Sequence, residues 1–193
     1  RGLPDVFDPD KRPWIDPDQG DVDELMSVIM DCPTGALQFE RTDTEYEEPV
    51  PEQNTITVVP DGPLYLHGDI EIEDSDGTVL LEDTRVGLCR CGASTNKPLC
   101  DNSHEDIEFE ASGTISDDQS SEGDQADDGT VRVTPIPDGP VRVDGNFEMN
   151  GQDGGSQRCV DGAMLCRCGA SGEKPACDGS HAEIGFSTAE SDE

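Results

Sequence analysis

The chain has 193 residues, of which 32% are hydrophobic and 4% aromatic, and 45 acidic against 12 basic residues give a formal charge of −33. So few apolar residues leave room for one or two domains with small cores, which usually need covalent or metal cross-links. The negative charge repels phosphate and anionic lipid, so we exclude nucleic acid and membrane surfaces as partners. No apolar run approaches the roughly 20 residues of a membrane span.

Acidic residues are spread along the whole chain, and lysines are few. This distribution resembles that of proteins from halophiles, and it favours the cytoplasm of a halophilic prokaryote, where salt screens the repulsion between carboxylates. The alternative is an ordinary acidic protein with disordered tails. Because the sequence starts at Arg1 and not at methionine, we expect a preceding segment, which could include a targeting peptide.

Residues 1–45 predict a small N-terminal unit. Asp21 and Glu24 have the spacing of a helix capping box. Apolar residues follow at the spacing of one helix face, at Val22, Leu25, Met26 and Ile29. Residues 35–39 are predicted to form a short strand, and residues 46–54, which are acidic and contain proline, a linker.

Two longer segments, 55–109 and 130–186, repeat one plan. Apolar and polar residues alternate in both, which predicts short antiparallel strands at 56–59, 64–66, 70–72, 130–134, 140–143 and 146–149. Turns are predicted at 61–63, 75–77 and 138–140. An acidic segment at 110–129 predicts a flexible connector between the repeats, and residues 187–193 an acidic tail.

The most informative stretch runs from Cys89 to His104 and returns from Cys166 to His181, 77 residues later. Twelve of its sixteen positions are identical in the two copies, which hold six of the eight cysteines and two of the three histidines. Thiolates and imidazoles at fixed spacing are metal ligands. Because chance would not duplicate such a set at one offset, each copy predicts one complete metal site.

Within each copy the ligands form two pairs. Cys-x-Cys brings two sulfurs together. Cys100 lies nine residues after the second of these cysteines, and His104 lies four residues after Cys100. A pair plus a pair suits a two-iron cluster, with two ligands for each iron. The alternative is zinc, for which three cysteines and one histidine make a good tetrahedral set.

Other residues of the repeated stretch have more than one interpretation. A helical turn is expected to begin near Cys100 and to present Cys100 and His104 on one face. Asp101 and Asp178 are expected to cap that turn rather than to act on the metal. The repeated stretch also carries four positive side chains, Arg90, Lys97, Arg167 and Lys174. They could offset the negative charge of a cluster, or they could simply be solvated. Phe109 and Phe186 occupy equivalent positions from which each could cover a cluster.

These motifs resemble the CDGSH iron–sulfur (NEET) family, over roughly residues 60–109 and 137–186. The second copy matches throughout, and the first departs at Asn102, where the family has glycine; asparagine tolerates the same turn. The resemblance implies two [2Fe-2S] clusters, one bound by Cys89, Cys91, Cys100 and His104 and the other by Cys166, Cys168, Cys177 and His181. It also implies an α+β fold, mostly small antiparallel β with short helical turns, in which two repeats form a pseudo-two-fold pair inside a monomer.

A second, weaker resemblance covers the N-terminal unit. Arg12-Pro-Trp-Ile15 and Asp31-Cys-Pro-Thr-Gly-Ala-Leu37 look like the back half of a divergent mono-cluster ferredoxin domain. The resemblance implies a truncated ferredoxin-like α/β fragment. It would hold a further cluster only with cysteines upstream of this chain, because Cys32 alone cannot; the alternative is a buried free cysteine at a helix end.

The remaining candidates are Cys159, which has no counterpart in the first repeat and is expected to be a free thiol, and His67, expected at the surface or in a turn. The function predicted is that of a non-enzymatic iron–sulfur protein in electron transfer, cluster transfer or redox sensing, with redox proteins or apo-proteins as partners. A subunit of a larger oxidoreductase and a zinc-stabilised interaction module are the alternatives.

Overall fold

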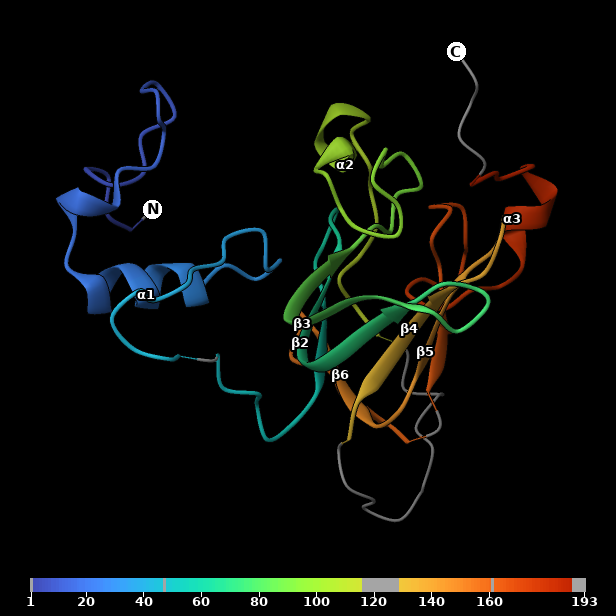
Figure 1. Ribbon diagram of the computed structural model, residues 1–193. Helices are drawn as coiled ribbons and strands as arrows, with labels where there is room; N and C mark the ends of the chain where they lie inside the picture. The colour runs from blue at the N-terminus through green and yellow to red at the C-terminus, as the bar shows by residue number, and fades with distance from the viewer. Residues whose placement is uncertain (1, 47, 116–128, 161, 189–193) are drawn as a thin grey trace.

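The computed structural model describes residues 2–46, 48–115, 129–160 and 162–188. A strand-rich region carries both repeats, and the N-terminal unit with its helix lies to one side of it (Figure 1). In chain order the elements are the 3₁₀ helix η1 (Pro17–Gln19), α1 (Val22–Met30), β1 (Thr55–Val58), β2 (Leu64–Glu73), β3 (Val79–Leu88), α2 (Ser103–Asp106), β4 (Val131–Pro135), β5 (Val141–Asp144), β6 (Phe147–Gly151), β7 (Ser156–Cys159), β8 (Ala163–Leu165) and α3 (Ser180–Glu183).

The N-terminal helix α1 forms where the capping residue predicts it. The Asp21 carboxylate accepts hydrogen bonds from the amides of Asp23, at 3.0 Å, and Glu24, at 3.4 Å. Of the predicted apolar face, Ile29 is buried and Val22 is exposed. The capped N-terminus therefore fixes where the helix begins, while tertiary contacts decide which apolar residues are covered.

The strand predicted at residues 35–39 is wrong. Gly35 has a φ of 65°, in the left-handed region, and residues 35–39 join no strand. The Arg85 guanidinium donates to the carbonyls of Cys32, at 2.9 Å, and Leu37, at 3.4 Å. A side chain on β3 and not a neighbouring strand therefore provides the hydrogen bond to the Leu37 carbonyl.

Each repeat is antiparallel within itself, as predicted, but the strands predicted at 64–66 and 70–72 are one strand, β2. A register shift between His67 and Ile70 bends it. The first half of β2 pairs with β1, and the second half with β4 of the other repeat. The predicted turns join the strands, with positive φ at Asp61, Gly77 and Asp138.

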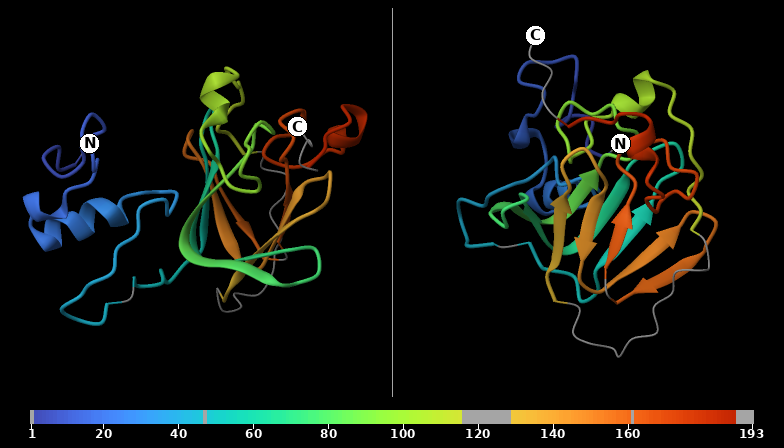
Figure 2. Two further views of the ribbon diagram at one scale, coloured as in Figure 1. Left: turned by 45° about the horizontal axis from the view of Figure 1, so that its top comes forward. Right: turned by 90° about the vertical axis from the view of Figure 1, so that its right-hand side faces the viewer.

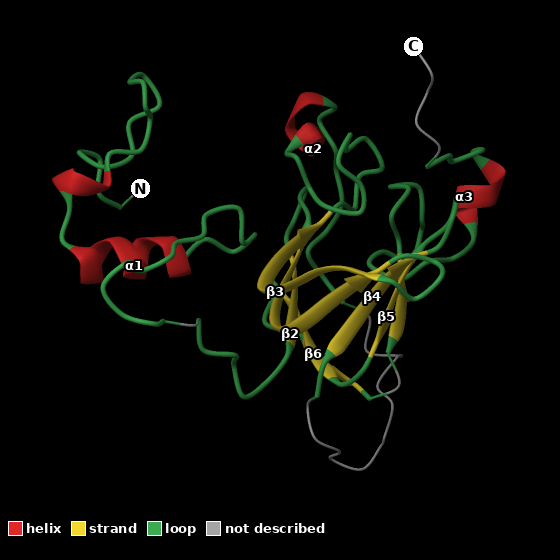
Figure 3. Ribbon diagram, in the orientation of Figure 1, coloured by secondary structure: helices red, strands yellow, loops and turns green. Residues whose placement is uncertain are grey.

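Two parallel pairings join the repeats, and the sequence analysis did not predict them. Thr55 of β1 lies opposite Glu148 of β6. The equivalent positions in the other repeat, 77 residues away, are Arg132 of β4 and Glu71 of β2, and these two residues also lie opposite each other. The two pairings between the repeats therefore have the same register. They join the described strands of both repeats into one eight-stranded sheet, visible in Figure 3.

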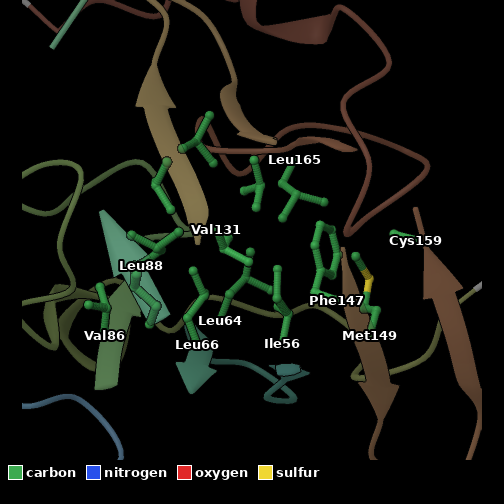
Figure 4. Packing of buried hydrophobic residues seen from close by; sticks show 14 of the residues in the cluster. Ile56, Leu64, Leu66, Val86, Leu88, Val131, Phe147, Met149, Cys159 and Leu165 are labelled. Atoms are coloured by element: carbon green, nitrogen blue, oxygen red, sulfur yellow. The ribbon is translucent and has the colours of Figure 1, made fainter. Parts of the chain in front are cut away.

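One hydrophobic core serves both repeats. Alternate residues of the strands point into it, among them Leu64 and Leu66 from the first repeat and Phe147 and Leu165 from the second (Figure 4). Ile115 packs against this core from inside the predicted connector 110–129, whose residues 116–128 lie outside the described residues. Sharing a core lets two short apolar sets bury more surface together than either could alone.

Asn54 ties the two repeats together at the end of the predicted linker. Its side chain is buried, donates to the carbonyls of Gly129, at 2.8 Å, and Asn146, at 3.1 Å, and accepts from the amide of Asp69, at 2.9 Å. A buried amide bonded at both ends fixes the chain where it enters β1.

Candidate metal centre

The repeated cysteine motifs begin where strands end. Cys89 follows β3 and Cys166 follows β8, and each cysteine amide donates at 2.8 Å to the carbonyl of a proline nine residues later. The amide of Cys100 donates to the carbonyl of Gly87, at 2.8 Å, and that of Cys177 to Met164, at 2.9 Å. Both loops are thus anchored to rigid strands, and α2 and α3, which follow them, lie at the same end of the sheet (Figure 2).

The structure brings the predicted ligands together in pairs. We call the set Cys89, Cys91, Cys100 and His104 the first site, and the set Cys166, Cys168, Cys177 and His181 the second site. The two cysteine sulfurs of the Cys-x-Cys pair are 3.7 Å apart in the first site and 3.8 Å apart in the second. The Sγ atom of the third cysteine lies 3.5 Å from the histidine Nδ1 in the first site and 3.4 Å in the second.

These distances fit two ligands of one tetrahedral metal, because two sulfurs bound at about 2.3 Å lie about 3.8 Å apart. Across the described residues, no three or more of the histidine, cysteine and acidic side chains gather closely enough to hold one ion. The close contacts within each site are therefore those of a cysteine pair and of a cysteine–histidine pair.

Protonation of the cysteines reflects how closely they are packed. A hydrogen bond from the Cys91 thiol lowers the pKa of Cys89 to about 6, and the same bond and burial raise the pKa of Cys91. Burial raises the pKa of Cys100 and Cys168 as well. Buried thiolates need a positive partner, and a metal ion is the partner that these pairs are arranged to accept.

The helical turns begin later than predicted. Helix α2 starts at Ser103 and α3 at Ser180, so Cys100 and Cys177 precede them. The residue immediately before each helix has a left-handed backbone conformation, with a φ of 70° at Asn102 and 92° at Gly179. The expectation that asparagine keeps this turn is confirmed. The left-handed residue turns the chain so that the cysteine faces the histidine without sharing its helix.

Asp101 and Asp178 have a structural role, as predicted, but the N-cap residues of the helical turns are Asn102 and Gly179. The Asp101 carboxylate accepts from the hydroxyl of Ser103, at 2.6 Å, and from the amide of Thr95, at 2.8 Å. Asp178 accepts in the same way from Ser180. These bonds hold the pKa of both carboxyls well below the usual range, and they fasten the helical turn to the preceding loop.

Of the two interpretations offered by the sequence, solvation is wrong for Arg90 and Arg167, whereas the charge of a cysteine in the opposite site does act on each guanidinium, Cys166 on Arg90 and Cys89 on Arg167. Both are buried, at 1% and 3% exposure. Arg90 donates to the carbonyls of Gly62, at 2.9 Å, and Val59, at 2.5 Å, and Arg167 makes the equivalent bonds in the second repeat. The arginines between the paired cysteines therefore anchor the metal-binding loops to the β-hairpins beneath them.

The phenylalanines and lysines of the repeated stretch contact the scaffold around the sites. The Phe109 ring lies against the Arg90 guanidinium, with 5.5 Å from Cζ to the ring centroid, and Phe186 lies against Arg167 at 5.6 Å. The Lys97 ammonium donates to the carbonyl of Ser94 within its own loop. These residues stabilise the scaffold of the sites through cation–π contacts and loop hydrogen bonds.

The serines of the repeated stretch were not recognised as structural. Ser94 is buried and donates to the carbonyl of Leu99, at 2.7 Å, and Ser171 repeats the bond with Ala176. Their identity in both copies was the available signal. Each serine closes the loop between the second and third cysteines.

The two sites approach each other through their Cys-x-Cys loops. A methyl group added at Gly92 would lie 2.7 Å from the carbonyl oxygen of Cys168, and one at Gly169 would lie 2.5 Å from that of Cys91. Both glycines have positive φ, 84° and 82°. Only glycine allows this backbone contact between the repeats.

The other candidates lie apart from the sites. Cys159 is a buried free thiol on β7, as predicted, and burial raises its pKa. His67 is exposed on β2, also as predicted. Cys32 offers a single thiolate within residues 1–45, whereas a 4Fe-4S cluster takes four cysteine ligands, so the residues present do not complete such a site.

Comparisons with protein families agree with both resemblances. A model described as iron-binding zinc finger CDGSH type matches residues 61–105 and 138–182, and one described as divergent 4Fe-4S mono-cluster matches residues 1–42. No curated protein matches the chain. In the described residues, no helix is long and apolar enough to cross a membrane. The chain therefore carries two tandem domains of the CDGSH iron-binding family, preceded by a divergent 4Fe-4S mono-cluster domain.

Proposed function

We propose that this iron–sulfur protein binds two [2Fe-2S] clusters, one at the first site and one at the second, each through three cysteines and one histidine. The observation that carries the proposal is the division of each site into a close cysteine pair and a close cysteine–histidine pair. A two-iron cluster takes two protein ligands on each iron, so one pair serves one iron.

The alternative is a zinc module, because three cysteines and one histidine also suit a single zinc ion. That ion would need all four ligands within about 4 Å of one another, as follows from bonds of 2.0–2.3 Å. The separation into pairs supports two metals per site.

The clusters would supply one-electron redox chemistry, and the chain's own residues hold them and set their environment. A histidine ligand is neutral where a cysteine ligand is anionic, which raises the reduction potential relative to all-cysteine ligation. We infer a role in electron transfer, cluster transfer or redox sensing, without an enzymatic activity of its own. Redox proteins or apo-proteins would be the partners.

We also infer that the two repeats form a pseudo-two-fold pair within a monomer. Matching strand registers at an offset of 77 residues, a common core and reciprocal glycine contacts support this arrangement. Sedimentation of the cluster-loaded chain should give the mass of one chain. A stable dimer would contradict the inference.

The setting we propose is the reducing cytoplasm of a halophile. All eight cysteines are free, and the formal charge is −33. At molar salt the Debye length falls to about 3 Å, so repulsion between the carboxylates is strongly screened. The melting temperature should therefore rise when potassium chloride is raised from 0.1 M to 2 M; a constant melting temperature would contradict this assignment.

The test of the cluster assignment is the metal content of the purified chain together with its spectra. We expect about four iron and four sulfide per chain, a red-brown colour and a paramagnetic signal after reduction, as two diiron clusters require. A colourless protein with two zinc ions and no sulfide would replace the proposal with the zinc alternative.

A further inference from the structure

The first repeat carries an arginine that the second repeat lacks. Arg85 on β3 is 4% exposed, and the residue 77 positions later is Gly162. The Arg85 guanidinium donates to the carbonyls of Ile29, at 2.5 Å, and Cys32, at 2.9 Å, both in the N-terminal unit. Its outer nitrogen also pairs with Glu48 at 2.7 Å. A saturated, buried arginine of this kind holds the N-terminal unit on the first repeat.

A second contact accompanies this ion pair. A methyl group at Gly87 would lie 2.9 Å from Cγ2 of Thr34, so the N-terminal unit packs directly on the strand backbone. The same Gly87 accepts the amide hydrogen bond of Cys100 through its carbonyl. In the second repeat the corresponding residue is Met164, which is 44% exposed. The N-terminal unit thus rests on the strand that anchors the third cysteine of the first site.

The first site is consequently enclosed on one side. A cavity of about 330 Å³ is lined by Thr34, Ala36 and Gln38 from the N-terminal unit and by Leu99 and Cys100 from the metal-binding loop. Tyr65 of β2 lies opposite Gly87 of β3, so it is next to the strand position on which the N-terminal unit rests.

We propose that docking of the N-terminal unit through Arg85 and Thr34 makes the two metal sites unequal: it protects the first site, and it leaves the second as the site from which a cluster leaves first. This inference depends on the proposed [2Fe-2S] clusters. It assigns the N-terminal unit a positioning and covering role that requires no cluster bound at Cys32.

The experiment follows cluster loss from the loaded chain into excess EDTA at fixed pH and salt, by visible absorption. We expect two phases of equal amplitude. His104→Cys and His181→Cys each change the absorption of one site, so they assign the phases, and the slow phase should belong to the first site. Equal rates at the two sites of a loaded protein would overturn the inference while leaving the proposed function intact. Absence of iron and sulfide would overturn both.

Arg85→Ala should release the N-terminal unit and accelerate the slow phase about tenfold, which corresponds to about 1.4 kcal/mol in the docking equilibrium. The matched control is Arg142→Ala, which removes an arginine from the exposed face of β5 and should leave both rates unchanged. Faster amide hydrogen exchange at residues 33–38 would show that the unit has been released.

Gly87→Met provides a second route, in case Arg85→Ala fails to fold. It places in the first repeat the residue that the second repeat already accommodates at the equivalent strand position, but it clashes with Thr34. We again expect faster exchange at residues 33–38 and a faster slow phase. A released N-terminal unit with an unchanged slow phase would overturn the proposed protection, and a unit that stays docked in both variants would overturn the role of Arg85 and Thr34.

Discussion

The two repeats share one design at their metal sites and differ in what surrounds them. The ligand spacing, the ligand pair distances within about 0.1 Å, the buried arginine and the serine that closes the loop are common to both. The strand leading into the site carries Arg85 and Gly87 in the first repeat, whereas Gly162 and Met164 stand there in the second. The two repeats therefore share their ligands, and only the first has the contacts that hold the N-terminal unit.

The largest expected effect tests whether the sites are independent. Cys100→Ala and Cys177→Ala each remove one ligand, and each should lower iron and sulfide content by about half, because each site holds its metal with its own four ligands. Metal analysis with an electron paramagnetic resonance spectrum measures the result. Loss of all iron from either variant would show that the two sites assemble only together.

Substitution of the buried arginines tests whether the two scaffolds are equivalent. Arg90→Ala and Arg167→Ala should each lower the free energy of unfolding by about 3 kcal/mol, because several buried carbonyls lose a charged donor. Denaturant unfolding of the cluster-loaded chain measures the change. A clear loss in one variant only would show that the shared core does not couple the two halves equally.

Replacing the histidines tests the electronic equivalence of the sites. His104→Cys and His181→Cys exchange a neutral ligand for an anionic one, so each should lower its own site's reduction potential by on the order of 100 mV. Each should also slow cluster loss in mild acid, since protonation of the imidazole competes with iron. Voltammetry and absorption at low pH measure both effects, and an unchanged potential would contradict ligation by that histidine.

The smallest effect concerns the one departure from the family motif. Asn102→Gly gives the first site the turn residue of the second, and it removes an amide oxygen 4.0 Å from the Cys100 sulfur. Because both residues adopt positive φ, we expect stability to change by less than about 0.5 kcal/mol. The two reduction potentials should move closer together in voltammetry. A wider separation would mean that Asn102 offsets another difference between the sites.

Local patterns predicted the parts of the structure that depend on local chemistry. The close pairing of the cysteines and histidines, the capped start of α1, five of the eight strands and the left-handed Asn102 follow from residue type and spacing, whereas β3, β7 and β8 were not predicted. Contacts between distant segments were not predictable in this way. Nothing in the local sequence distinguished Arg85 from a surface arginine, because the carbonyls that it binds, those of residues 29, 32 and 37, come from a distant segment.

The parallel pairings of β1 with β6 and of β4 with β2 have a consequence for folding. A single repeat on its own would present an open strand edge, and such edges recruit further strands. An identical repeat has the strand edge that fits, so an isolated repeat should self-associate. When both repeats belong to one polypeptide, this association is intramolecular and no longer depends on concentration. Each repeat can then differ in sequence from the other and still pair with it.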